Sequence, residues 1–330
     1  MKVGILGCTG LVGQKYVSLL RSHPFFEIGF LSASDKNVGK QIDGIPIQPL
    51  EHIEKDTCEL YFSALPSKIA YTLEMRLARK GKWVISSSSA FRNIQDVPVI
   101  IPEINGAHLS LIEDQRMRLN TTSGGIVAKP NCTLQSFLLP LYPLHEAFEL
   151  SSVVVTNLQA VSGGGKRATS DLLDNLFPYI PNEEEKSESE PLKILGDMSI
   201  RFSAHCVRVP ILHGHTSLVN ATFKKEVNVN ECIDLWEHFH GLALPSAPKR
   251  PVQYTTDVTR PQPKLDRDRE GGMAVSVGRL RACSVHDIKF VALSHNLLRG
   301  AAGGGVLLAE LIAEKECWYG REKSAIHQTV

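Results

Sequence analysis

The sequence predicts an α/β protein with two domains, and three observations support this prediction. The chain has 330 residues, more than the roughly 250 to 300 residues at which one hydrophobic core stops growing. Its composition, 43% hydrophobic and 22% charged, is that of a globular protein. In the first third of the chain, short aliphatic and β-branched runs alternate with segments of helical periodicity, which is typical of parallel strands joined by crossover helices.

The first domain is expected to open with a strand, a turn and a helix. Residues 2–6 form a short β-branched and aliphatic run, a glycine-rich turn follows, and apolar residues then recur at helical spacing from Tyr16 to Leu20. Further along we expect strands at 26–32, 60–65 and 83–87 and a helix at 70–80. This alternation predicts a parallel sheet.

The composition changes around 121–130, where Gly124 and Gly125 occur, and we place a domain boundary there. Beyond it we expect helices at 133–148 and near 169–176, a polar segment at 181–190, and strands at 152–159, 206–210 and 217–222. The final apolar stretch, 300–312, is expected to form a helix that packs back against the first domain. The chain would then cross the boundary twice.

Charge and cysteine content limit the classes of partner. With 36 basic and 35 acidic residues, the chain lacks the overall field that attracts nucleic acid or an anionic membrane, so any anion site must be local. Seven cysteines, an odd number without a CxxC pair, indicate a reducing compartment. No secretory leader and no apolar run of about 18 residues is evident. We expect a cytoplasmic protein without a metal site.

A glycine-rich loop suggests a cofactor. Gly7, Gly10 and Gly13 form GxxGxxG directly between the first expected strand and the first expected helix. Glycines at this position let the backbone amides approach a pyrophosphate at the helix N-terminus. A tight turn without a ligand would show the same spacing, but the alternating pattern favours a Rossmann-type dinucleotide-binding domain. The cofactor would contact Gly7, Thr9, Gly10, Leu11, Val12 and Gly13.

The end of the second strand bears on the choice between NAD and NADP. NAD enzymes usually carry an acidic residue here that binds the ribose 2′-hydroxyl, whereas this chain has Ser34 before Asp35 and Lys36. A serine hydroxyl and a lysine suit a 2′-phosphate, so we expect NADP(H) with contacts from Ser34 and Lys36. Asp35 leaves NAD open, and Lys36 and Lys40 could equally be solvated lysines.

One cysteine occupies a position suited to nucleophilic chemistry. Cys132 lies in the sequence PNCT, where a loop enters an apolar helix. We expect it in the first helical turn, where the helix dipole lowers a thiol pKa. Free cysteines are usually small buried hydrophobes, and we expect that of the other six.

At this point the chain resembles the aspartate-semialdehyde dehydrogenases, especially the branch found in archaea and fungi. The resemblance covers almost the whole length, and the order and spacing of its motifs are highly specific. The motifs are GILGCTGLVG (4–13), FSALPS (62–67), SSAFR (88–92), VPVIIPEIN (97–105), KPNCT (129–133), LQAVSGGG (158–165), CVRVPILHGH (206–215), RPQPKLDRD (260–268) and HNLLRGAAGG (295–304).

The resemblance implies a role for each matching residue. It makes Cys132 the nucleophile, Gln159 the residue that orients a thioester intermediate, and His215 the acid/base. It assigns the substrate phosphate to Arg92 and Lys186 with Asn131 nearby, the α-carboxylate to Arg208 and the amine to Glu183. It adds Ser162, Gly163 and Asn296 to the cofactor contacts.

The residues alone leave several of these roles open. Arg208, between two valines on an expected strand, could form a buried salt bridge or clamp a ligand. The run 183–186 would more commonly be a solvated charged segment. Because His213 and His215 would share one side of a strand, alternation does not separate them.

The resemblance also implies the reaction. It is the NADPH-dependent reductive dephosphorylation of L-aspartyl 4-phosphate to L-aspartate 4-semialdehyde through a cysteine thioester. This step serves the biosynthesis of lysine, diaminopimelate, threonine and methionine. Rival readings are N-acetyl-glutamyl-phosphate reductase, whose cysteine motif is PGCY, glyceraldehyde-3-phosphate dehydrogenase, whose motif is SCTTNC, and a non-catalytic dinucleotide-binding sensor.

The resemblance further implies a domain plan. A dinucleotide-binding domain would comprise 1–128 with 302–330, and an α+β catalytic and dimerisation domain with a mixed sheet would comprise 129–301. The protein would be a homodimer or homotetramer. Two departures from the family pattern stand out: Ser86 and Ser87 replace an Asp or Asn pair, and Lys129 replaces the usual Asn before PNC. We expect the charge of Lys129 to lower the Cys132 pKa further.

Overall fold

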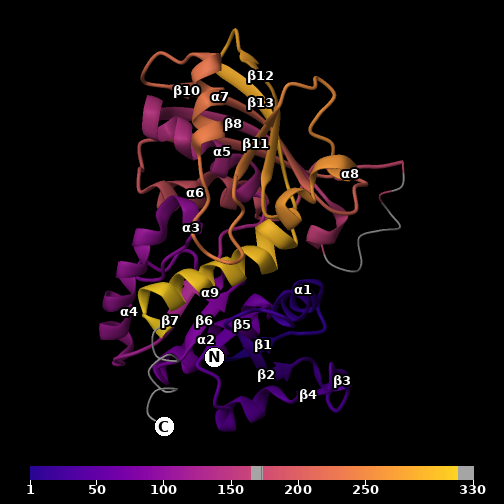
Figure 1. Ribbon diagram of the computed structural model, residues 1–330, viewed down its shortest axis with the longest axis vertical. Coiled ribbons are helices and arrows are strands. Elements are labelled where there is room, and N and C mark those ends of the chain that lie inside the picture. The colour runs from indigo at the N-terminus through magenta and orange to yellow at the C-terminus, as the bar shows by residue number, and fades with distance from the viewer. Residues whose placement is uncertain (165–171, 173, 319–330) are drawn as a thin grey trace, which may run out of the picture.

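The computed structural model describes residues 1–164, 172 and 174–318. Figure 1 shows two sheets at opposite ends of the molecule, with the long helix α9 (Gly303–Lys315) running between them. One sheet is built from the first part of the chain and the other from its later part. The predicted two-domain α/β fold is confirmed, while the residues at which one domain passes into the other remain a prediction.

The first sheet is doubly wound. Its order is β3-β4-β2-β1-β5-β6-β7, and neighbouring strands are parallel except β3 and β4. Numbered along the chain, its parallel strands follow the order 3-2-1-4-5-6, which is typical of dinucleotide-binding domains. The order reverses between β1 and β5, so a ligand is expected beyond the carboxyl ends of these strands. The strands are β1 (Lys2–Leu6), β2 (Glu27–Ser32), β3 (Gln41–Ile42), β4 (Ile45–Gln48), β5 (Leu60–Ser63), β6 (Trp83–Ser86) and β7 (Gly125–Ala128).

Helices cover both faces of this sheet. On one face, α1 (Leu11–Leu20) and α9 pack together, and Tyr16 and Val306 belong to one apolar cluster with Val3 and Ile5 of β1. The other face packs against α2 (Ser67–Arg79). The predicted return of the last helix to the first domain is therefore confirmed. Two short helices, α3 (Pro102–Asn105) and α4 (Ile112–Leu119), precede β7.

The second sheet is mixed, as predicted. Its order is β11-β12-β13-β10-β8-β9, with β8 and β9 parallel and β10 antiparallel to both β8 and β13. Helices α5 (Leu134–Phe148), α6 (Glu183–Leu195) and α7 (Val229–His238) pack against it, and α8 (Pro263–Asp266) is short. The strands are β8 (Leu150–Gln159), β9 (Arg201–Arg208), β10 (His215–Phe223), β11 (Val252–Thr255), β12 (Val275–Ala282) and β13 (Ile288–Ser294).

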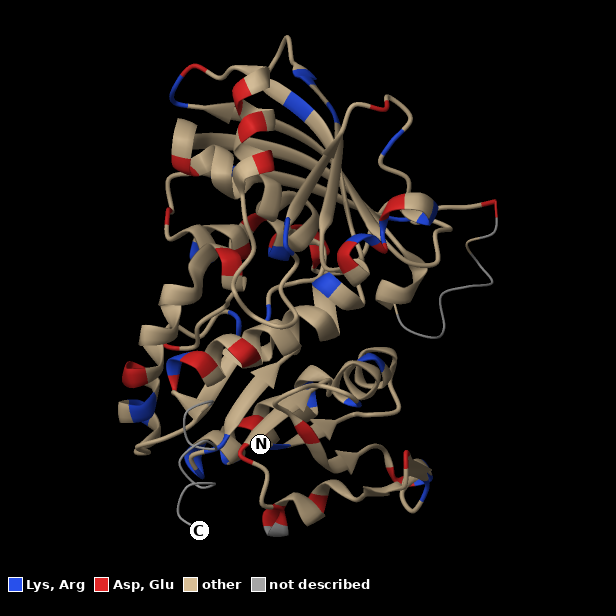
Figure 2. Ribbon diagram, viewed as in Figure 1, with Lys and Arg blue, Asp and Glu red and all other residues tan. Residues whose placement is uncertain are grey.

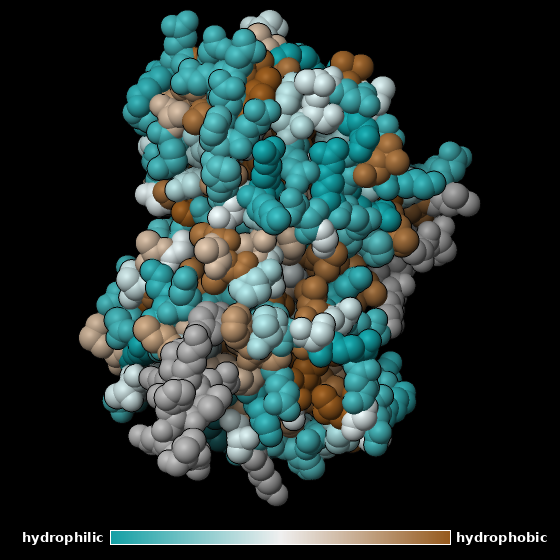
Figure 3. Space-filling view, viewed as in Figure 1, coloured by the Kyte–Doolittle hydropathy of each residue, from teal (hydrophilic) through white to brown (hydrophobic). Residues whose placement is uncertain are grey.

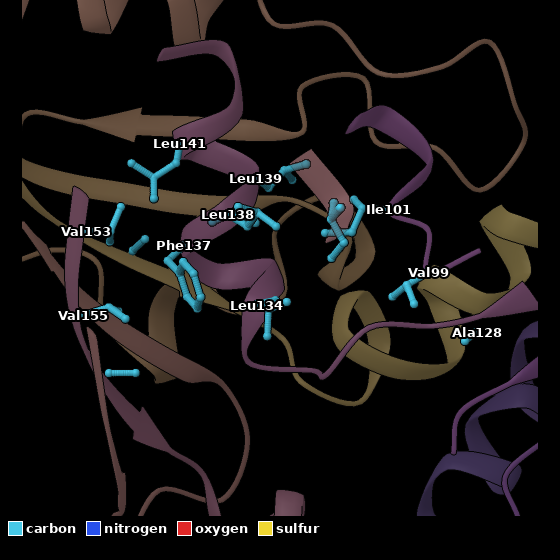
Figure 4. Packing of buried hydrophobic residues seen from close by; sticks show 14 of the residues in the cluster. Val99, Ile101, Ala128, Leu134, Phe137, Leu138, Leu139, Leu141, Val153 and Val155 are labelled. Carbon is cyan, nitrogen blue, oxygen red and sulfur yellow. The ribbon is translucent and has the colours of Figure 1, made fainter. Parts of the chain in front are cut away.

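Helix α5 joins the two parts of the molecule through one continuous apolar core. Figure 4 shows Phe137 pointing towards Val153 and Val155 of β8, while Leu139 lies on the side of Ile101. The same cluster extends to the α2 face of the first sheet. Because α5 is packed against both sheets, the position of the loop between β7 and α5 is fixed between them.

The surface agrees with the near-zero net charge. In Figure 2 basic and acidic residues are interspersed along both halves of the chain, and Figure 3 shows hydrophilic residues over most of the same face. Among the described residues, no helix combines the length and apolarity that crossing a membrane requires.

Some expected elements differ from the structure. The polar segment 181–190 is largely helical, because α6 begins at Glu183, and of its carboxylates Glu190 is buried and Glu183 is partly buried. Strand β9 begins at Arg201 rather than at 206, and β10 begins at His215 rather than at 217. The helix expected near 169–176 falls mostly outside the described residues.

Candidate active site

Two adjoining cavities lie where the sheets face each other. The larger has a volume of about 990 Å³ and the smaller about 320 Å³. Segments that follow β1, β2, β5 and β6 line the larger cavity, which is the place that the strand order predicts for a dinucleotide. Residues shared by both linings make the cavities continuous: Val12, Leu65, Ser87, Ser162, Gly163 and Leu297.

The glycine loop has the geometry that an anion site needs. Gly7 has a φ of +82°, and a side chain at Gly13 would begin 2.1 Å from the carbonyl oxygen of Gly7. These two glycines shape the turn without lining the cavity, whereas Thr9, Gly10, Leu11 and Val12 line it. No side chain caps α1 at Gly10, so its first amides are free to face a pyrophosphate.

The segment after β2 favours a phosphate rather than a ribose hydroxyl. Ser34 and Lys36, the predicted cofactor contacts, line the larger cavity, and Lys40 lines it too, whereas Asp35 does not. Asn37, which sequence reasoning missed, donates to Ser34 Oγ (3.3 Å) and accepts from Lys40 Nζ (2.9 Å). Two lysines and a serine hydroxyl therefore gather at one end of the cavity, which fits a dinucleotide with a 2′-phosphate.

The smaller cavity contains the predicted nucleophile and every predicted substrate-binding residue. It lies where the segment after β7 meets the carboxyl ends of β8 and β9, which pair through Gln159 and Arg208. Cys132 and Gln159 line it together with Arg92, Asn131, Glu183, Lys186 and Arg208. His215 opens β10 and is fully buried behind the cavity wall.

Cys132 and His215 are in direct contact. The Cys132 Sγ atom lies 3.2 Å from His215 Nε2, and the backbone N–H of Ala160 donates to His215 Nδ1 at 3.0 Å. A ring nitrogen that accepts a hydrogen bond carries no proton, so the neutral ring carries its hydrogen on Nε2, facing the sulfur. Burial lowers the pKa of His215 to about 3, which further favours this neutral form.

The expected depression of the thiol pKa is wrong. Helix α5 begins at Leu134, so Cys132 precedes the helix instead of lying in its first turn. Burial, with a smaller contribution from Glu183, raises the pKa of Cys132 to about 11, while nearby cations lower it. Lys129 is one of those cations and acts in the expected direction, although it does not outweigh burial.

Glu183 holds a network of donors at the cavity. It accepts from Lys186 Nζ (2.8 Å), Gln159 Nε2 (3.0 Å) and Asn131 Nδ2 (2.9 and 3.0 Å). Burial raises the pKa of Glu183, yet these hydrogen bonds hold its pKa below the usual value. The site therefore presents an ionised carboxylate to a ligand.

Arg92 has donors left for an anion. Its side chain is 8% exposed, and its Nη1 donates to Glu190 (2.7 Å) and its Nη2 to the carbonyl oxygen of Ser87 (3.3 Å). Among the described residues its Nε finds no partner although it is buried. A buried guanidinium with unused N–H groups fits an oxyanion.

Arg208 forms no buried salt bridge within the described part of the chain. It is 7% exposed, and its Nη1 donates to the carbonyl oxygen of Ala160 (2.8 Å). A side chain at Gly163 would begin 2.8 Å from the same Nη1, so only glycine permits this close approach. The geometry favours the ligand clamp over the salt bridge.

The structure separates the two histidines that alternation could not. His213 lies outside β10, and its Nδ1 is 2.9 Å from Ser162 Oγ. Asn296 Nδ2 donates to the same hydroxyl (2.9 Å) and lines the smaller cavity rather than the larger. Asn296 therefore contacts a residue that lines the larger cavity, Ser162, without lining that cavity itself. Of the two histidines, His215 contacts Cys132.

Sequence reasoning missed Glu190, which is only 5% exposed. Its Oε1 accepts from Arg92 and its Oε2 accepts from the backbone N–H of Asn131 at 2.7 Å. The one signal in the sequence is its spacing: seven positions after Glu183, it falls on the same face of a helix.

Comparisons with known proteins agree with this geometry. Residues 2–112 match the semialdehyde dehydrogenase NAD binding domain, and residues 141–299 match the semialdehyde dehydrogenase dimerisation domain. The aspartate-semialdehyde dehydrogenase of Archaeoglobus fulgidus is 40% identical, with 95% of this chain and 98% of the relative covered.

Two further relatives add information on cofactor and substrate. The crystal structure of aspartate semialdehyde dehydrogenase with NADP from Candida albicans superposes with a TM-score of 0.85 at 34% identity, covering 96% of this chain and 99% of that one. The malonyl CoA reductase (NADP) of Metallosphaera sedula is 36% identical, covering 96% of this chain and 97% of the relative.

Lys129 provides a test of the electrostatics at Cys132. It is 4% exposed and lines the smaller cavity, where burial and Arg92 lower the pKa of Lys129 to about 7. Below pH 7 it is charged and stabilises the thiolate, and above that pH it loses its charge. We predict that wild type reacts with iodoacetamide at Cys132 about three to ten times faster than Lys129→Met at pH 6. The two rates should converge above pH 8.

Lys129→Arg is the matched control, because a guanidinium keeps its charge throughout this range and should react faster than Lys129→Met at every pH. The rate of Cys132→Ser, subtracted throughout, removes the background of the other cysteines. A wild-type to Lys129→Met ratio that is independent of pH would contradict the prediction.

Proposed function

The chain belongs to the semialdehyde dehydrogenase family, and we propose that it reduces L-aspartyl 4-phosphate to L-aspartate 4-semialdehyde with NADPH. The observation that carries this proposal is the contact between Cys132 and His215 in a cavity that continues into the dinucleotide cavity. The names of the relatives from Archaeoglobus fulgidus and Candida albicans support the same substrate.

The charged groups of the cavity match those of the proposed substrate. Arg92 has unused N–H groups and Lys186 a flexible ammonium, which together suit a phosphate dianion. Arg208 would receive the α-carboxylate, and the ionised Glu183 would receive the ammonium. Binding the amine at Glu183 would also free Lys186, which donates to Glu183 in the structure (2.8 Å).

The chemistry begins with the Cys132 thiolate. Its sulfur attacks the acyl carbon, a C–S bond forms, and the C–O bond to phosphate breaks, leaving a thioester and inorganic phosphate. When bound, a nicotinamide dinucleotide supplies the hydride that reduces this thioester. Gln159, at the end of β8, would hold the thioester carbonyl through its amide.

His215 serves this sequence as a hydrogen-bond donor. Its Nε2–H faces the sulfur, so it stabilises the thiolate and then the oxyanion that forms beside it. To act as a base towards the thiol, Nε2 must be free of hydrogen, and Nδ1 would then have to give up the bond from Ala160. The geometry therefore supports His215 as a hydrogen-bond donor to the sulfur more directly than as a base that removes the thiol proton.

The larger cavity would hold NADPH. The loop from Thr9 to Val12 suits the pyrophosphate, and Ser34, Lys36 and Lys40 suit the 2′-phosphate. Ser162 and Gly163 line both cavities, so the reactive end of the cofactor would lie against them, close to Cys132.

Glu183 distinguishes the proposed substrate from its rivals. An ionised carboxylate is matched by the free ammonium of aspartyl phosphate, but not by malonyl CoA or an acetylated amine, which carry no positive charge there. A sensor without catalysis would leave the Cys132–His215 contact without a use. We place the reaction in the cytoplasm, on the route to lysine, diaminopimelate, threonine and methionine, and the seven free cysteines fit a reducing compartment.

The second sheet offers a surface for a homodimer. Helices α5, α6 and α7 pack on one face, while Thr156, Leu218 and Val291 pair side by side on the other. Leu218 is 41% exposed there. A row with two apolar side chains, on a sheet face against which none of the described helices α5, α6 and α7 packs, lies within residues that match a dimerisation domain. It supports a dimer formed by two copies of this face.

The activity is tested in the phosphate-dependent oxidative direction, with aspartate semialdehyde, NADP and phosphate. We predict turnover by wild type and a loss in kcat of more than about 10³-fold in Cys132→Ser. Cys283→Ser, at a partly buried free cysteine that lies outside both cavities, is the control and should keep full activity. Turnover of malonyl CoA with NADPH, without turnover of the semialdehyde, would overturn the proposal.

The cofactor preference is tested at Lys36. Lys36→Ala should raise the KM for NADP about tenfold, because a charge-assisted contact with the 2′-phosphate is lost. The KM for NAD should stay the same. Lys224→Ala, at an exposed lysine beside Glu149, controls for the loss of one surface charge. An equal rise for both cofactors would argue against a 2′-phosphate site here.

The dimer is tested at Leu218. Wild type should sediment with twice the mass of the chain, and Leu218→Asp should sediment as a monomer, since a carboxylate would be desolvated in the interface. Met198→Asp, at an exposed methionine outside this sheet face, should remain dimeric. A monomeric wild type at micromolar concentration would refute the proposed interface.

A further inference from the structure

We propose that Glu190 is a positioning residue that holds the phosphate-binding arginine and the nucleophile loop in one fixed geometry. This inference rests on the proposed function, because it assigns to Glu190 a role in using the phosphate. No motif drew attention to this residue, which lies at the end of the charged run on α6.

Both oxygens of Glu190 are used, and on two different segments. Oε1 accepts from Arg92 Nη1, just after a short 3-10 turn at Ser89–Phe91, and Oε2 accepts from the N–H of Asn131. Both distances are 2.7 Å, which is short and typical of charge-assisted hydrogen bonds. The carboxylate therefore connects the loop after β6 to the loop after β7.

The hydrogen bonds of Asn131 also restrict the position of Cys132, the next residue in the chain. The backbone N–H of Asn131 is held by Glu190, its side-chain Nδ2 by Glu183, and its Oδ1 by the N–H of Thr133 (2.9 Å). The residue before the nucleophile is thus fixed at three atoms. Removing the Glu190 contact would loosen the backbone that carries the sulfur.

The grip on Arg92 orients its guanidinium. With Nη1 taken by Glu190 and Nη2 by Ser87, the unpartnered Nε and the remaining hydrogens are left for a ligand. Lys193, one turn further along α6, donates to the carbonyl oxygen of Arg92 at 3.0 Å. One helix therefore holds both the side chain and the backbone of this arginine.

A purely structural ion pair and a positioning residue make different predictions. A structural pair would affect stability alone, or both substrates alike. A residue that aims Arg92 and the Cys132 loop should selectively weaken the use of phosphate and slow the chemistry of the thiol. The measurements that separate them are the KM for each substrate and the alkylation rate of Cys132.

The experiment compares Glu190→Gln with Glu188→Gln in the phosphate-dependent oxidative assay. Glu188 is the matched control, because it lies on the same helix and also accepts from a backbone N–H, that of Ala204 (2.9 Å), outside the cavity. In Glu190→Gln we expect the KM for phosphate to rise about tenfold and the KM for the semialdehyde to change less than about twofold. Iodoacetamide should react with Cys132 several-fold more slowly, and Glu188→Gln should match wild type in all three.

A double-mutant cycle tests whether Glu190 acts through Arg92. The double variant Arg92→Gln with Glu190→Gln should have a KM for phosphate within about twofold of that of Arg92→Gln alone. The reason is that Arg92→Gln already removes the guanidinium that Glu190 orients. A further tenfold rise would mean that Glu190 acts independently, and would overturn the proposal. So would a folded Glu190→Gln with wild-type KM values and alkylation rate.

Glu190→Asp keeps the experiment decisive if Glu190→Gln does not fold. Its carboxylate is ionised but one methylene shorter, so it should show the same selective rise in the KM for phosphate, and wild-type values would refute the role. Alkylation requires no turnover. A wild type that alkylates normally without phosphate-dependent turnover would therefore reject the proposed function, while slower alkylation of Glu190→Gln would still support the grip on the loop.

Discussion

The candidate active site depends on hydrogen bonds between two carboxylates of α6, one buried and one partly buried, and the segment around Cys132. Glu183 and Glu190 lie two turns apart on one face of the helix, and both accept hydrogen bonds from Asn131. Through them α6 also contacts Gln159, at the end of β8 in the second sheet, and Arg92, in the loop after β6 of the first sheet. The site lies between the two sheets. Because α6 contacts residues from both sides, it fixes their relative positions.

Electrostatics in this buried place impose a second constraint. Removing Cys132 from water disfavours its thiolate, and burial likewise keeps His215 neutral. Nearby cations compensate in part: Arg92, Arg208 and, below about pH 7, Lys129 all lower the thiol pKa, in opposition to burial and Glu183. Under the proposed mechanism, the reactivity of the sulfur would come from surrounding cations and the Nε2–H of His215 rather than from a helix dipole, since α5 begins two residues later.

The sequence predicted the fold and the residues that line the candidate site better than it predicted the electrostatics of that site. Alternating periodicity and the glycine-rich turn predicted the first sheet. The residues that the motifs proposed for substrate binding lie together in one cavity. Periodicity could not show that Glu190 is buried and Glu183 partly buried, because a charged helix is predicted to be solvated until its partners are known. Nor could it separate His213 from His215, since the difference is where β10 begins.

The fold by itself does not select the substrate. A relative named malonyl CoA reductase and another named aspartate-semialdehyde dehydrogenase are 36% and 40% identical to this chain over nearly its whole length. Because one fold can host different reactions, we expect the discrimination between these substrates to come from a few groups in the smaller cavity. An ionised carboxylate beside the nucleophile is costly to bury and rewards only a cationic substrate group. Under the proposed function, Glu183, held ionised by three donors, is the residue whose chemistry would separate the two classes.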